Sequence, residues 1–148
     1  MRYTVPAVLV LALLPGVLST VDAQSFDGAW ITTVSCEAAR DALGYSYRFV
    51  SIVKNRALHG LHGTEGQPSS LQIDGTIAPD CTARLYATGR TGSKEYVPGR
   101  DTPGGTEYRY NIDAHFAGSL GAGRRIEGPS LHTCVYEGVS NPVEGAPR

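Results

Sequence analysis

Apolar and polar residues alternate in short runs along most of the chain. A period of two is typical of strands whose two faces meet different surroundings. In the cleanest run, Glu107–Gly118, one face carries Tyr108, Tyr110, Ile112, Ala114 and Phe116, and the other carries Arg109, Asn111, Asp113 and His115. The predicted strands are Ala29–Cys36, Tyr45–Lys54, Ala57–Thr64, Ser70–Ala78, Thr82–Thr88, Glu107–Gly118, Arg124–Glu127 and Leu131–Glu137. The segment Glu37–Leu43 is the one candidate for a short helix.

Short turns join the predicted strands in sequence order. Asn55-Arg56 and Pro79-Asp80-Cys81 are typical hairpin connections, whereas Arg90–Thr106, rich in Gly and Pro, is a long loop. A meander of about eight strands has two unpaired edges, and closure into a barrel pairs them with each other. We therefore expect an all-β, antiparallel up-and-down barrel, with an open β-sandwich as the alternative.

The first residues have the layout of a secretory signal peptide. Arg2 is the positive charge, Val5–Leu18 is apolar, and Val21-Asp22-Ala23 resembles a cleavage site. A membrane anchor is the alternative, but the apolar run is shorter than the roughly 20 residues that a span needs. We therefore expect cleavage before Gln24 and a periplasmic or secreted product.

Composition limits the kinds of partner. A chain of 148 residues supports one domain, so we expect a signal peptide at 1–23, a barrel domain at 24–138 and a flexible tail at 139–148. The formal net charge of −1 argues against binding to nucleic acid or to a membrane surface, because both need clustered positive charge. The expected partner is thus a small molecule or a protein.

The 3 cysteines are expected to include one disulfide, since export leads to an oxidising compartment. Cys36 ends the first predicted strand and Cys134 lies in the last one, whereas Cys81 lies in a turn that should point into solvent. We predict a Cys36–Cys134 disulfide and a free Cys81. A zinc site is the alternative, but the C-x-x-C spacing typical of one is missing, so no metal is predicted.

The start of the domain, Gly28-Ala29-Trp30, resembles the Gly-x-Trp opening of avidin-type and lipocalin-type barrels. This resemblance implies that Trp30 closes the floor of the barrel and that a basic residue near the last strand, Arg124 or Arg125, packs over it. Even spacing independently places Trp30 and Cys36 on one face of their strand, which should be the interior. The layout also resembles small exported bacterial proteins, which implies a location and no activity.

Catalytic motifs are weak in this sequence. His59 and His62 are three residues apart, so in a strand they point to opposite faces and cannot share a metal ion without a bulge. Asp113 and His115 share a face and could form a general base, but a solvated polar face explains them more simply. No nucleophile elbow, dinucleotide fold or phosphate-binding loop is present. We predict no catalytic residue and no cofactor; a small hydrolase is the least favoured hypothesis.

Two binding hypotheses follow from the arrangement of aromatic and basic residues. The first is a small-ligand site in the barrel mouth, formed by Tyr45, Tyr47, Tyr108 and Tyr110. The second is a protein-interaction or enzyme-inhibitor site on the long loop, with Arg90, Tyr96 and Arg100, since long loops on β scaffolds often carry function. A cavity above roughly 300 Å³ would favour the first, and a filled barrel with an ordered loop would favour the second.

Overall fold

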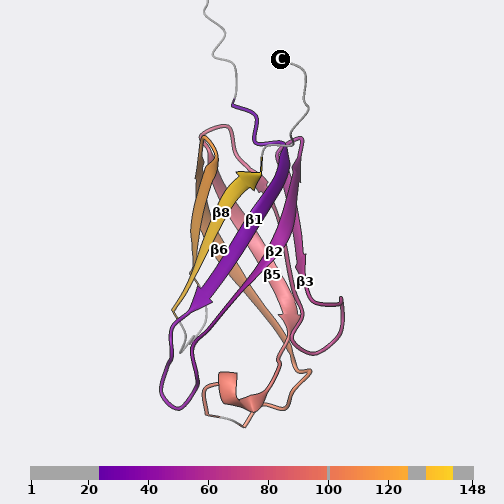
Figure 1. Ribbon diagram of the computed structural model, residues 1–148, viewed down its shortest axis with the longest axis vertical. Coiled ribbons are helices and arrows are strands. Elements are labelled where there is room, and N and C mark those ends of the chain that lie inside the picture. Colours follow the sequence, from indigo (N-terminus) through magenta and orange to yellow (C-terminus); the bar gives the residue numbers. More distant parts are fainter. Residues whose placement is uncertain (1–23, 100, 127–132, 142–148) are drawn as a thin grey trace, which may run out of the picture.

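The computed structural model describes residues 24–99, 101–126 and 133–141. In these residues eight antiparallel strands follow one another around a closed barrel (Figure 1). The strands are β1 (Gly28–Cys36), β2 (Tyr45–Lys54), β3 (Ala57–His62), β4 (Leu71–Ile77), β5 (Thr82–Arg90), β6 (Glu107–Ala117), β7 (Leu120–Arg125) and β8 (Cys134–Asn141). A 3-10 helix, η1 (Lys94–Tyr96), is the one helical element in the described residues. The predicted all-β meander barrel is confirmed, and the sandwich alternative is wrong.

Six of the strands begin and end within two residues of their predicted bounds, but the last two do not. The strand predicted at Arg124–Glu127 is β7, which starts earlier, at Leu120, because Gly121 and Gly123 hide its alternation. The last strand was predicted to end at Glu137, yet β8 continues to Asn141, which pairs with Ala29 of β1. Three residues of the expected flexible tail are therefore part of the barrel. The expected signal peptide and residues 127–132 and 142–148 lie outside the described residues.

The helix expected at Glu37–Leu43 is also wrong. Ala39 and Ala42 form an isolated antiparallel bridge, with backbone hydrogen bonds of 3.2 and 2.9 Å. Arg40 between them has a φ of 54°, a left-handed conformation that interrupts a right-handed helix. The segment is a tight turn at the tip of the β1–β2 loop.

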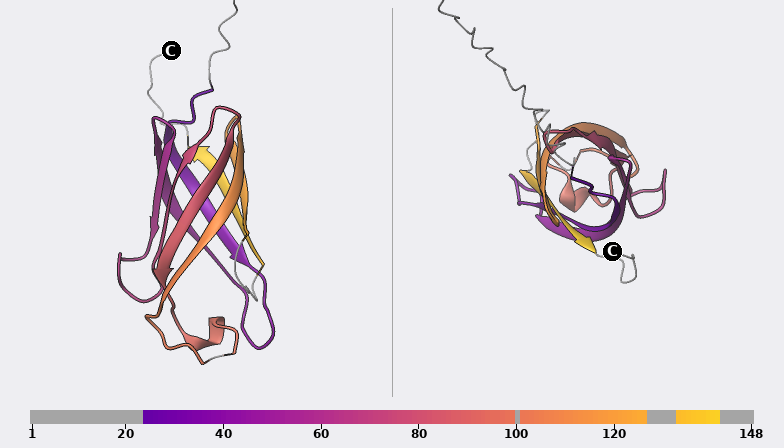
Figure 2. Two further views of the ribbon diagram at one scale, coloured as in Figure 1. Left: turned by 180° about the vertical axis from the view of Figure 1, so that it is seen from behind. Right: turned by 90° about the horizontal axis from the view of Figure 1, so that it is seen from above.

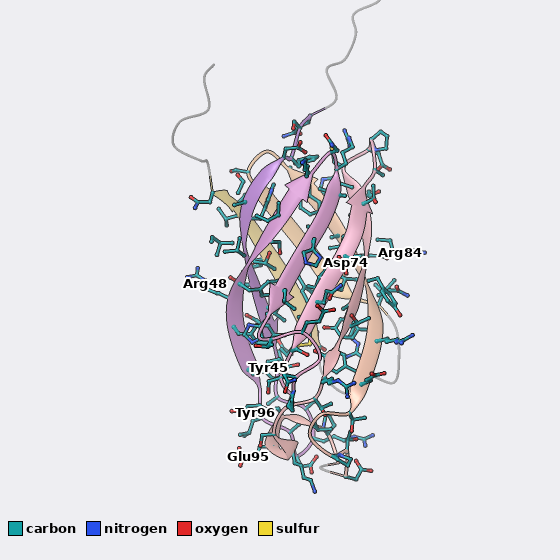
Figure 3. The ribbon with its side chains drawn as sticks, turned by 90° about the vertical axis from the view of Figure 1, so that its right-hand side faces the viewer. Tyr45, Arg48, Asp74, Arg84, Glu95 and Tyr96 are labelled. Carbon is teal, nitrogen blue, oxygen red and sulfur yellow. A yellow bond between two sulfur atoms is a disulfide. The ribbon has the colours of Figure 1, made fainter. Side chains whose placement is uncertain are left out.

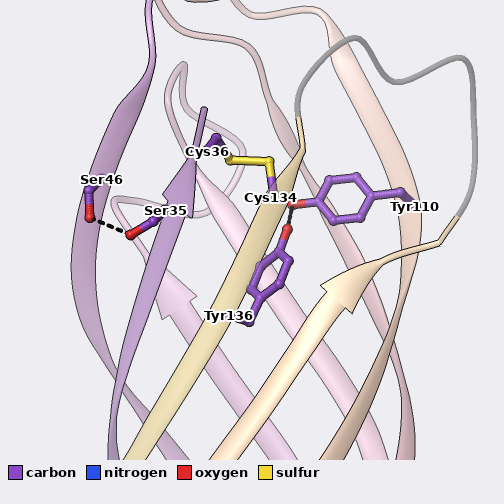
Figure 4. Close-up of a disulfide and its surroundings, with 6 residues drawn as sticks. All are labelled: Ser35, Cys36, Ser46, Tyr110, Cys134 and Tyr136. Carbon is purple, nitrogen blue, oxygen red and sulfur yellow. Dashed lines mark hydrogen bonds between the residues drawn. A yellow bond between two sulfur atoms is a disulfide. The ribbon is translucent and has the colours of Figure 1, made fainter. Parts of the chain in front are cut away.

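A continuous ladder between β1 and β8 closes the barrel, from Ala29–Asn141 to Cys36–Cys134. The predicted Cys36–Cys134 disulfide is confirmed, and it joins two directly paired residues whose Cα atoms are 4.1 Å apart (Figure 4). Cys81 is free, as predicted, and lies in the β4–β5 turn with a φ of 68°. Its side chain is half-buried against the core rather than directed into solvent.

The two ends of the barrel differ in the length of their connections (Figure 2). The floor end carries the short turns β2–β3, β4–β5 and β6–β7, and the mouth end carries the longer loops 37–44, 63–70 and 91–106. Trp30 lies at the floor end with 2% of its surface exposed, and its indole N–H donates to the Phe26 carbonyl oxygen at 2.9 Å. The Phe116 ring meets the indole edge-on at 5.3 Å between ring centroids. Trp30 is therefore in the interior, as its strand face predicted.

Candidate functional site

The four tyrosines predicted to line the mouth all point inward and stack in pairs. The rings of Tyr45 and Tyr47 are parallel at 5.9 Å between centroids, and those of Tyr108 and Tyr110 stack at 5.8 Å. Tyr136 of β8, which sequence reasoning missed, donates its hydroxyl to the Tyr110 hydroxyl at 2.6 Å (Figure 4). These residues pack against the core cluster and against one another. They form the layer of the core that lies nearest the mouth.

Arg125 also points into this layer. Its guanidinium carbon lies 4.1 Å from the centroid of the Tyr110 ring, a distance suited to a cation–π contact. The expectation that Arg125 or Arg124 would pack over Trp30 is wrong, because β7 ends at the mouth whereas Trp30 lies near the floor, and Arg124 points outward.

Burial raises the pKa of the tyrosine hydroxyls at the mouth. It raises the pKa of Tyr110 to about 12, although the hydrogen bond with Tyr136 and the positive charge of Arg125 oppose the shift. Burial is also the largest cause of a raised pKa at Tyr45, Tyr47, Tyr108 and Tyr136. At neutral pH the hydroxyls are therefore uncharged and act as hydrogen-bonding core groups.

The barrel interior holds a small cavity. Its volume is about 40 Å³, and it lies between Trp30, Ser51, Phe116 and Tyr136, among others. The buried Ser51 hydroxyl, which lies on the wall of the cavity, is hydrogen-bonded to the Thr32 hydroxyl at 2.7 Å. It therefore needs no ligand as a hydrogen-bond partner. A volume of this size accommodates water and falls well below the 300–1,000 Å³ of typical ligand pockets.

The long loop folds across the mouth (Figures 2 and 3). The Leu43 N–H donates to the Glu95 carbonyl oxygen at 2.8 Å, and the Gly99 N–H donates to the Asp41 carboxylate at 2.9 Å. Tyr96 meets Tyr45 edge-on at 5.8 Å between centroids. The loop is therefore held against the β1–β2 loop. Tyr96 keeps 40% of its surface exposed, and Arg100 lies outside the described residues.

The base of the long loop is clamped by two threonines. The Thr91 N–H donates to the Thr106 carbonyl at 2.9 Å, and the Thr106 N–H donates to the Thr91 hydroxyl at 3.0 Å. Both hydroxyls donate to the Pro103 carbonyl, at 2.8 and 2.7 Å. The two chain segments that enter and leave the loop are thereby fixed relative to the barrel wall.

Beside this clamp, the outer wall of β3–β6 is hollowed. This rim hollow has a volume of about 250 Å³, and its polar lining residues are Glu65, Ser70, Gln72, Thr88, Arg90, Glu107, Tyr108 and Arg109. Arg90 donates to the Gly105 carbonyl and to the Glu107 carboxylate, both at 2.8 Å. Arg109 and Glu65 are exposed and form no ion pair within the described part of the chain. The hollow thus presents one positive and one negative group that are free to meet a ligand.

Gly89 shapes the back of the rim hollow. A Cβ atom at this position would collide with the Ser70 carbonyl and with the Tyr108 hydroxyl. Its absence lets the Tyr108 hydroxyl cross β5 and donate to the Ser70 carbonyl at 2.9 Å, which ties the β3–β4 loop to β6. A glycine inside a strand often marks such a close approach. This was the signal in the sequence that could have pointed to the hollow.

The other polar candidates are placed on separate surfaces. His59 points outward and contacts the Asp74 carboxylate at 2.6 Å, whereas His62 points inward and stacks on Tyr47 at 4.0 Å between centroids. Their predicted opposite directions are confirmed. The Asp113 carboxylate forms an ion pair with Arg84 at 3.2 Å on the exposed outer wall. Arg84 is seen on this wall in Figure 3. No group of three or more metal-ligating side chains occurs among the residues that the structure describes.

Comparison with protein families, with curated proteins and with solved structures gives no match to this chain. Within the described residues, none of the helical structure is long and apolar enough to cross a membrane.

Proposed function

We propose that the protein is an exported interaction module that binds a segment of a partner protein in the rim hollow, beside the long loop. The disulfide supports export, because disulfides form and persist in oxidising compartments. The observation that carries the proposal is the hollow of about 250 Å³ on the outer wall, lined by both flanks of the long loop.

The alternative small-ligand site in the mouth has less support. Such a site needs an enclosed cavity of roughly 300 Å³ or more, and the interior cavity is about 40 Å³. Tyr45, Tyr47 and Tyr110 are engaged in stacking, and the long loop crosses above them. We therefore assign these tyrosines to the core, and only Tyr108 also borders the rim hollow.

The chemistry of the rim hollow favours a charged, extended segment. Arg109 can bind a carboxylate through two parallel hydrogen bonds, which is the strong mode of arginine recognition. Arg90 is held by Glu107 and Gly105 and contributes a fixed polar wall. Glu65 supplies a negative charge at the β3–β4 side, where a basic residue of the partner would fit. The preferred segment thus carries an acidic and a basic residue a few positions apart.

Selection of a displayed random-peptide library on the purified protein tests this function. We expect the recovered peptides to contain acidic residues and to shift the backbone NMR signals of Gln72, Thr88 and Arg109. Arg109→Glu should weaken their affinity at least about tenfold, because truncating or reversing one member of a close charge pair costs more than about 1.4 kcal/mol.

Arg124→Glu is the matched control, since Arg124 is an exposed strand arginine that does not line the hollow. It should leave the peptide affinity unchanged. Peptides that bind equally well to the Arg109→Glu variant, or whose NMR shifts lie elsewhere, would refute the proposal.

A further inference from the structure

The outer face of β7, β8, β1 and β2 carries a continuous row of apolar side chains. The cross-strand register places Val50 beside Ile31, Ile31 beside Val139, and Val139 beside Leu120. Ile52 and Ala29 form a second, shorter row next to it. Directly paired side chains lie about 5 Å apart on the same face. These six residues are the apolar face; β8, β1 and β2 are turned toward the viewer in Figure 1.

Four of the six residues of the apolar face are exposed, by 59% for Leu120, 51% for Val50, 50% for Val139 and 48% for Ile52. Ile31 and Ala29, which lie between them on β1, are half-buried. The outer wall across the barrel, on β4–β6, instead carries the charged residues Asp74, Arg84, Arg109 and Asp113. An antiparallel sheet normally presents polar side chains to solvent, and a contiguous apolar patch marks an interaction surface.

Opposite charges border the apolar face on its mouth side. Arg48 of β2 and Glu137 of β8 are both paired in register with Thr33 of β1, so they flank it on either side. Arg48 donates to the Thr33 hydroxyl at 3.3 Å. Neither charge forms an ion pair within the described ranges. Figure 3 shows Arg48 projecting outward from the barrel wall.

We propose that the apolar face binds a second copy of this chain and forms a symmetric dimer. A twofold axis along the β1–β8 seam places β1 of one copy opposite β8 of the other and β2 opposite β7. Ile31 then faces Val139 of the other copy, and Val50 faces Leu120. Glu137 of the other copy then lies opposite Thr33, one strand spacing to the side of Arg48, so the two long side chains meet across the gap of about 10 Å between the packed sheets. One positive and one negative charge on opposite sides of the axis make the surface self-complementary, as an isologous interface requires.

The size of the face sets the strength of the dimer. Together with the bordering row of Arg48, Thr33 and Glu137, the face covers at most four strands at about 4.8 Å and three rows of side chains at about 6.7 Å, a footprint of roughly 400 Å² per copy. This is about half of the roughly 800 Å² per partner that specific, stable interfaces bury, and it falls in the range of weak, transient ones. We therefore expect a transient dimer with a dissociation constant of about micromolar or above. The rim hollow is on another part of the wall and stays accessible in the dimer. Failure to dimerise would therefore not contradict peptide binding in the hollow, and failure to bind peptides would not contradict the dimer.

Sedimentation equilibrium of the purified protein from about 1 µM to about 1 mM measures the dimer. Val139→Asp places a charge in the centre of the interface and should raise the dissociation constant at least about 30-fold, as expected for a hot-spot residue. Arg48→Glu and Glu137→Arg should each raise it about tenfold. The double exchange should return it to within about threefold of the original value.

Arg84→Glu, an equivalent change on the opposite wall, is the control and should have no effect on the dissociation constant. An unchanged far-UV circular dichroism spectrum and native Trp30 emission show that each variant remains folded. A monomer at every concentration, an unchanged constant in Val139→Asp, or failure of the double exchange to restore association would overturn the proposal. So would a monomer that binds phosphatidylcholine vesicles through Val139, because the face would then be a lipid contact.

Discussion

Removal of the Cys36–Cys134 disulfide tests how the barrel is held closed. The appropriate perturbation is the double variant Cys36→Ala/Cys134→Ala, which leaves no unpaired thiol at the seam. Both residues are nearly inaccessible to solvent, with 5% and 3% exposed, so alanine keeps an apolar side chain at each position. The eight paired positions of β1 and β8 retain their backbone hydrogen bonds in the variant. We therefore expect the native barrel to form without the bridge.

The disulfide stabilises the protein mainly by restricting the conformations of the unfolded chain. The disulfide joins residues separated by 98 positions, and the chain-entropy relation gives about 4.7 kcal/mol at 25 °C for a loop of this length. A single domain is typically stable by about 5–15 kcal/mol. The bridge thus contributes a large part of the free energy of unfolding, and the variant should be close to its folding limit at 37 °C.

Urea unfolding followed by far-UV circular dichroism and Trp30 fluorescence measures the difference. We expect the free energy of unfolding to fall by about 3–5 kcal/mol, with a steeper urea dependence because the unfolded variant exposes more surface. Cys81→Ala removes the free thiol without opening a bridge, and should change the stability by less than about 1 kcal/mol. A loss under about 1 kcal/mol in the double variant would refute the loop-closure argument.

Three further predictions concern the floor, the mouth and the rim hollow. Trp30→Ala should cost about 3–5 kcal/mol in urea unfolding, and native Trp30 emission should be blue-shifted; a solvent-exposed emission maximum would contradict its burial. The pKa of the Tyr110 hydroxyl is raised from 10.0 to about 12 in the folded protein, so between these pH values the hydroxyl keeps its proton in the folded state and loses it in the unfolded state. The free energy of unfolding should therefore be unaffected by ionisation of Tyr110 below pH 10 and should fall as the pH rises towards 12, by up to about 1.4 kcal/mol per pH unit. Urea unfolding across this range, with phenolate absorbance, measures the loss; a flat profile would contradict it. Gly89→Ala should break the hydrogen bond from Tyr108 to Ser70, cost about 1–3 kcal/mol and abolish peptide binding in the rim hollow; unchanged affinity by calorimetry would exclude this role of Gly89.

Much of the barrel could be predicted because its main signals are local. The alternation in Glu107–Gly118 assigns each side chain to a face, and the structure places Tyr110 and Phe116 inside. The two edges of a meander can be paired only by each other, so Cys36 and Cys134 could be placed side by side before any coordinates existed. The same periodicity placed Trp30 in the interior. These inferences depend on neighbouring residues and on one topological rule.

The rim hollow and the β1–β2 loop could not be predicted in this way, because they depend on contacts between distant segments. The alanines of Glu37–Leu43 favour a helix locally, but the Glu37 N–H donates to the Thr133 carbonyl and the Leu43 N–H donates to the Glu95 carbonyl. These tertiary hydrogen bonds override a weak propensity. Arg109 could be assigned to the outer face from its position. That the nearby Glu107 pairs with Arg90, and that Arg109 has no ionic partner among the residues that the structure describes, could be learned only from the structure.

The pairing of Ala29 with Asn141 has a consequence for how the protein can be attached to other structures. The chain enters and leaves the barrel at the floor end, opposite the long loop (Figure 2), and the rim hollow lies beside that loop. A fusion partner or a surface linkage at either terminus would therefore hold the floor and present the mouth outward. Since both ends lie on adjacent strands, a short linker could join them, and new termini could be opened in the β2–β3 turn without disturbing the mouth.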